Sequence, residues 1–121
     1  MNNEFVDWDA GEIVFVNENS NNDDNLGIYF TKPISLDTAM DRINNQYGYR
    51  HVKTITFLSD ATITTDYSIP RDMTFKGTRH TYTLTVNNPI NTGIYNLTAG
   101  KNLITSLANN LESWTVSLKK N

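Results

Sequence analysis

The chain has 121 residues, 38% of them hydrophobic, and a net charge of −3 from 10 Lys+Arg against 13 Asp+Glu. This length suits one domain with a thin core. The acidic balance gives no attraction to phosphate backbones or anionic lipid, so we expect no nucleic acid partner. The absence of cysteine excludes disulfides and thiolate metal sites. The polar start and the lack of a long apolar run argue against secretion and against insertion in a membrane, so we expect no membrane partner.

Asparagine and threonine, at 17 and 16 residues, together favour turns and strands, so most of the chain should be β. Residues 1–30 contain seven acidic residues and no Lys or Arg. Within them, strand-like runs at 12–16 and 27–31 flank a polar stretch at 17–25, which predicts a β-hairpin. We therefore expect an acidic β-hairpin segment at 1–34, followed by a body at 35–121, with the whole forming one compact unit.

One helix is predicted at residues 36–46. Five apolar residues from Leu36 to Tyr47 recur at helical spacing, and Ser35 is placed to cap the N-terminus. Asp37 in the first turn suits the helix dipole, and Gly48 is placed to end the helix.

Beyond Val52 the sequence changes to short strand-like runs separated by Asp, Asn, Gly and Pro. The expected strands are 54–58, 62–65, 73–76, 82–86, 94–97, 103–106 and 114–118. Three apolar series repeat in this region at about 20 residues. They are Ile55, Phe75, Ile94 or Tyr95, and Trp114; Ile63, Leu84 and Ile104; and Ile69, Ile90 and Leu111. Three positions per period predict a short right-handed parallel β-helix capped by the helix, with an antiparallel β-sandwich or jelly roll as the alternative.

Residues 36–43 and 52–63 resemble the entry segment of pectate-lyase-like β-helix proteins, and residues 69–77 resemble their repeat of an apolar residue and proline, a strand and a glycine. The resemblance covers about residues 35–118 and implies a right-handed β-helix with a capping helix. A short chain that is rich in Asn and Thr, lacks cysteine and begins with an acidic β segment looks more like a piece of a phage tail spike or fibre than like the longer enzymes of that superfamily. By analogy, the chain would be a non-catalytic structural or adhesive module of the virion, a homotrimer, with host-surface polysaccharide as a candidate ligand.

Two other functions stay open. One is a polysaccharide-active enzyme; as a separate point, the bacterial cell surface stays open as an alternative location to the virion. The other is a small protein-binding inhibitor in the host cytoplasm, whose acidic segment would dock on a basic partner.

Catalysis has only weak candidates. Asp60, Asp66 and Asp72 recur at six-residue intervals and could supply the carboxylate pair of glycoside cleavage, although aspartate is also a common turn residue. His51 and His80 lack a third metal ligand at a suitable spacing, so we expect no metal site and no cofactor. For sugar binding, Tyr49 and Tyr67 are the rings that we expect to be exposed, since a sugar packs its C–H face on an aromatic ring.

Overall fold

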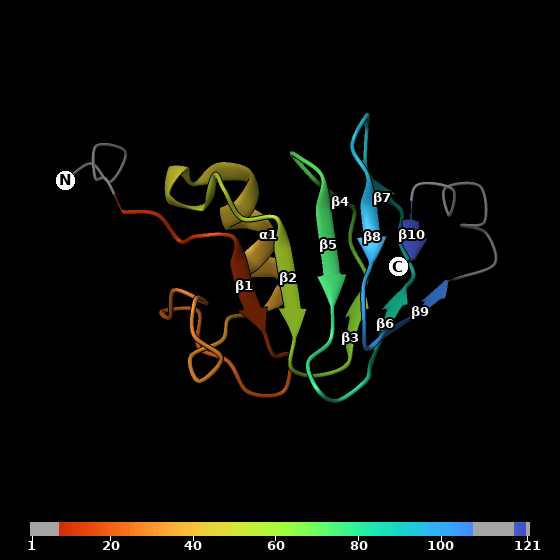
Figure 1. Cartoon of the computed structure of the whole chain (residues 1–121), viewed down its shortest axis with the longest axis horizontal. Helices are drawn as coiled ribbons and strands as arrows, with labels where there is room; N and C mark the ends of the chain where they lie inside the picture. Colours follow the sequence, from red (N-terminus) through yellow and green to blue (C-terminus); the bar gives the residue numbers. More distant parts are fainter. Residues whose placement is uncertain (1–7, 108–117, 121) are drawn as a thin grey trace.

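The computed structural model describes residues 8–107 and 118–120, and it is made mostly of strands with one α-helix (Figure 1). The helices are α1 (Leu36–Asn45) and the short 3₁₀ helix η2 (Tyr47–Tyr49). The strands are β1 (Ile13–Val16), β2 (Thr54–Phe57), β3 (Ala61–Ile63), β4 (Tyr67–Ser68), β5 (Met73–Lys76), β6 (Tyr82–Val86), β7 (Ile90–Asn91), β8 (Leu97–Ala99), β9 (Leu103–Leu107) and β10 (Leu118–Lys120). No helix in the described ranges is long and apolar enough to cross a membrane.

The strands form three parallel sheets, ordered β1-β2-β5-β8-β10, β3-β6-β9 and β4-β7. Successive strands enter these sheets in turn, and we call each passage a coil: β2 to β4 is the first, β5 to β7 the second, and β8 and β9 belong to the third. The arrows of β1, β2, β5 and β8 accordingly point the same way (Figure 1). Since all the named strand pairs in the described residues are parallel, the antiparallel sandwich is wrong.

The predicted repeat is correct between the first two coils on the five-stranded sheet and wrong afterwards. Ile55 lies opposite Phe75, as expected, but Phe75 lies opposite Ala99 instead of Ile94 or Tyr95. The reason is a turn at residues 92–95, which lengthens the second coil and leaves Ile94 91% exposed. The strand expected at 94–97 therefore starts only at Leu97.

The other two series also miss the register. Ile63 pairs with Val86, and Leu84 pairs with Thr105, so Ile104 points outward and is 53% exposed. In the third sheet, Ile90 lies opposite Tyr67 and not opposite Ile69. Leu111 and Trp114 lie outside the described residues.

The N-terminal β-hairpin is wrong as well. β1 pairs in parallel with β2, which places Val14 and Val16 fully in the core, and it is the first strand of the five-stranded sheet. Residues 27–31 form no strand; Gly27 instead accepts a hydrogen bond from the Phe15 backbone N–H at 2.7 Å. Burial on the parallel sheet outweighs the shorter connection of a hairpin. The division of the chain into segments 1–34 and 35–121 stays a prediction. The pairing of β1 with β2 joins the two segments in one sheet.

Helix α1 begins as predicted, with the Ser35 hydroxyl accepting from the Thr38 backbone N–H at 3.2 Å. It buries the apolar face that starts at Leu36 and lies beside β4, where the Asn44 amide donates to the Ser68 carbonyl at 3.0 Å. A strand of a preceding coil would occupy that position in a longer stack, so α1 closes this end of the third sheet. The helix, and not another strand, thereby sets the surface next to β4.

Candidate functional site

The three predicted aspartates do not share one edge of the molecule. Asp60 lies in the turn between β2 and β3, Asp66 between β3 and β4, and Asp72 between β4 and β5. Each carboxylate accepts a hydrogen bond from a residue one coil further along the chain. These bonds run from the Thr83 backbone N–H to Asp60 (2.8 Å), from the Asn88 side-chain amide to Asp66 (3.1 Å) and from the Asn96 backbone N–H to Asp72 (2.9 Å). The six-residue interval thus places one aspartate at each corner of the first coil, where it ties that coil to the next, and it builds no carboxylate pair.

Tyr49 was predicted to be exposed, and this prediction is wrong because the residue is buried. Its side chain is 1% exposed, its hydroxyl donates to the Leu26 carbonyl at 2.7 Å, and the Trp8 ring packs edge-on against it at 5.5 Å. Gly48 allows this packing, because a Cβ at that position would lie 2.6 Å from the Trp8 ring. A ring enclosed in this way offers no face to a sugar.

Tyr67, in contrast, lies on β4 with its ring half-buried. Its hydroxyl donates a hydrogen bond to the Asp37 carboxylate on α1. Desolvation by burial, followed by that bond to Asp37, raises the pKa of Tyr67 above its ordinary value of 10.0. The hydroxyl therefore keeps its proton at neutral pH and holds the ring between α1 and β4.

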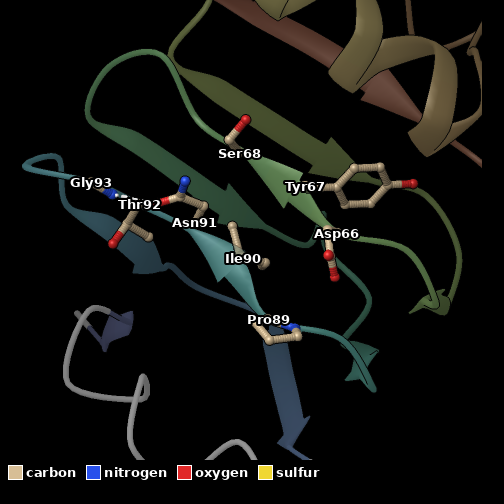
Figure 2. A pocket seen from close by; sticks show the side chains of 8 residues that line it. All are labelled: Asp66, Tyr67, Ser68, Pro89, Ile90, Asn91, Thr92 and Gly93. Atoms are coloured by element: carbon tan, nitrogen blue, oxygen red, sulfur yellow. Dashed lines mark hydrogen bonds between the residues drawn. The ribbon is translucent and has the colours of Figure 1, made fainter.

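Two surface hollows meet at Tyr67. One, of about 610 Å³, extends over β7, and the other, of about 460 Å³, extends over α1; both contain Asp66, Tyr67 and Ser68. We call the combined hollow the Tyr67 groove. Figure 2 shows its β4–β7 part, with Tyr67 and Ser68 on β4, Asp66 just before that strand, and Pro89 to Gly93 along and around β7. The α1 part is lined by Asp37, Met40, Asp41, Asn44 and Asn45.

The lining of the Tyr67 groove combines carboxylates, amides and hydroxyls, which can hydrogen-bond a sugar, with the Tyr67 ring and the apolar residues Met40, Pro89 and Ile90. A surface hollow that sets one aromatic face among several hydrogen-bonding side chains suits a carbohydrate, which packs its C–H face on the ring and bonds through its hydroxyls. The α1 residues of the groove were missed from the sequence, because only the tertiary fold brings residues 37–45 beside residues 66–68.

The two histidines lie outside the groove lining. His51 Nδ1 is 2.5 Å from Asp9 Oδ2, and the Gly11 backbone N–H, followed by His51, lowers the pKa of Asp9 below its ordinary value of 3.8. His80 stacks in a tilted arrangement near Tyr82. In the part of the chain that the structure describes, no three His, Asp or Glu side chains converge as they would around a metal ion.

Comparison with known proteins finds no protein-family model, no curated protein and no solved structure that matches this chain.

Proposed function

We propose that the chain is a non-catalytic structural or adhesive module of a phage tail spike or tail fibre. In this proposal the chain is a short right-handed parallel β-helix that assembles as a homotrimer. The module contacts host-surface glycan through the Tyr67 groove. The observation that carries the proposal is the order of the strands, which enter three parallel sheets in turn. Such a stack presents side chains in rows along its length, a surface suited to extended ligands and to neighbouring copies.

The enzyme alternative is weaker because its candidate carboxylates are at separate corners and engaged in bonds between coils. Glycoside cleavage needs two carboxyl groups on opposite sides of one bond.

The inhibitor alternative is weaker because much of the acidic segment is used internally. Glu18 accepts from the Leu36 backbone N–H at 3.0 Å, and Asp23 accepts from Ser35. Both carboxylates thus stabilise the N-terminus of α1 and have hydrogen-bonding capacity already used within the chain.

Glycan binding is tested with an array of bacterial surface polysaccharides and two variants. Tyr67→Ala removes the groove ring and should weaken binding about tenfold, because a tenfold change in affinity corresponds to the free energy of about one aromatic contact. Tyr29→Ala is the control, because Tyr29 is 59% exposed and outside the groove. Equal affinities for wild type and Tyr67→Ala, after both are shown to fold by circular dichroism, would refute the proposed site.

Assembly is tested by light scattering. The proposal predicts three times the 13.7 kDa mass of the chain at micromolar concentration. A monomer at that concentration would refute the trimer and leave the glycan site to be judged by its own test.

A further inference from the structure

The charged groups that line the Tyr67 groove are all acidic. Asp37, Asp41 and Asp66 are in the lining, and no Lys or Arg is. Among the described residues, none of these three carboxylates has a cationic side chain within 4.0 Å, whereas Asp9 pairs with Arg50 and Glu12 with Lys53. The groove therefore keeps negative charge that the protein does not neutralise.

Each of these carboxylates also keeps room for further hydrogen bonds. Asp37 accepts from Tyr67, Asp41 accepts from Asn45 at 2.9 Å, and Asp66 accepts from a single amide. An ionised carboxylate accepts about four hydrogen bonds and donates none. A ligand that fills the groove must therefore supply donors.

The donors of the protein in this groove are partly committed. The Asn44 amide, for example, already donates to the Met40 and Ser68 carbonyls. An anionic sugar would bring more acceptors and a like charge next to three carboxylates, which is unfavourable. A protonated amine brings three donors and the opposite charge.

We propose that the Tyr67 groove selects glycans that carry free, protonated amino groups, such as glucosamine-containing chains, over neutral and anionic glycans. This inference rests on the proposed function, because it names the ligand class of the same groove. The ring of Tyr67 packs on the sugar, and the carboxylates of Asp37, Asp41 and Asp66 receive the ammonium and hydroxyl donors.

Calorimetry with two matched tetrasaccharides tests the selection. Glucosamine tetramer and N-acetylglucosamine tetramer share a backbone and differ only in the acetyl groups that remove the charge. The wild-type chain should bind the glucosamine tetramer at least about fivefold more tightly, which corresponds to a single favourable exposed ion pair. A galacturonic acid tetramer should bind more weakly than both.

Variants assign the effect to the groove. Asp41→Asn and Asp66→Asn each keep a side-chain oxygen for the existing amide bond and remove one charge, so each should weaken glucosamine tetramer binding about two- to fivefold and weaken binding of the uncharged N-acetyl tetramer by a smaller factor. Asp24→Asn is the control, because Asp24 is exposed and outside the lining of the groove.

Three results would overturn the inference. One is equal affinity for the two tetramers; another is an effect of Asp24→Asn as large as that of Asp41→Asn, which would indicate attraction to the acidic chain as a whole. The third is binding of other glycans, in a manner that depends on Tyr67, with no binding of the glucosamine tetramer. Absence of Tyr67-dependent binding to every glycan would instead refute the proposed glycan site itself.

Discussion

Removing the carboxylates of Asp60, Asp66 and Asp72 measures how strongly the corner bonds hold successive coils together. Each aspartate accepts one hydrogen bond from the next coil at 2.8 to 3.1 Å. A hydrogen bond of this kind contributes about 1 kcal/mol net, and bonds at three separate corners should add. The triple alanine variant should therefore lose about 3 kcal/mol of unfolding free energy, equivalent to about 12 °C in Tm for a domain of this size.

Urea unfolding followed by circular dichroism gives this free energy. The triple asparagine variant is the matched form, because it keeps an oxygen at each corner and should lose less than half as much as the alanine variant. Asp24→Ala, an exposed aspartate of the 17–25 loop, should change stability by less than about 0.5 kcal/mol. If the triple alanine variant is as stable as the wild type within that margin, the corner aspartates do not tie the coils together and their recurrence needs another explanation.

Three further predictions concern the core, the turns and pH. Phe75→Ala should cost about 3–5 kcal/mol in urea unfolding because Phe75 is 1% exposed, whereas Ile94→Ala should cost under about 0.5 kcal/mol; similar losses would contradict the burial. Gly77→Ala should cost about 2 kcal/mol or more, since its Cβ would lie 1.9 Å from a backbone oxygen of the third coil, and Gly93→Ala only about 1 kcal/mol, from its φ of +55° in open space. The backbone N–H of the helix N-cap residue, as the largest cause, lowers the pKa of Asp23 below 3.8, so this carboxylate contributes stability above pH 3.8 that is lost as the pH falls through the lower folded-state pKa. Asp23→Asn should flatten the acid limb of a pH series of urea midpoints, and curves parallel to the wild type would refute its part in acid unfolding.

Helix α1 and the first two strands of the second coil, β5 and β6, could be predicted because their signals are local, whereas the two-residue strand β7 was missed. Ser35 caps the helix, and alternation of apolar and polar residues marks β5 and β6 with the observed bounds. The start of the third coil could not be predicted in this way, because Ile94 and Tyr95 read as strand residues but lie in an exposed turn, and β8 begins only at Leu97. The sequence there contains the turn signal Gly93, with its positive φ, and the regular spacing obscured it.

The candidate site was predicted in part. Asp66 and Tyr67 do line a groove, whereas Tyr49 is buried because its neighbour Gly48 admits the Trp8 ring, a contact between segments that a local pattern does not reveal. The hairpin failed for a related reason: the partner of β1 lies 41 positions away, from Ile13 to Thr54, beyond the reach of turn signals.

The position of α1 and its loop ahead of the coils has a consequence for how the molecule is made. Ribosomal synthesis releases β1 and α1 before the coils, and β1 supplies a strand on which β2 can pair as it emerges. Each later strand then finds its partner already in place, one passage upstream, from β2 to β5 and on to β8. If folding follows the direction of translation, only the most recently formed strands have unpaired edges. Each edge is covered by the next coil, which shortens the time available for aggregation.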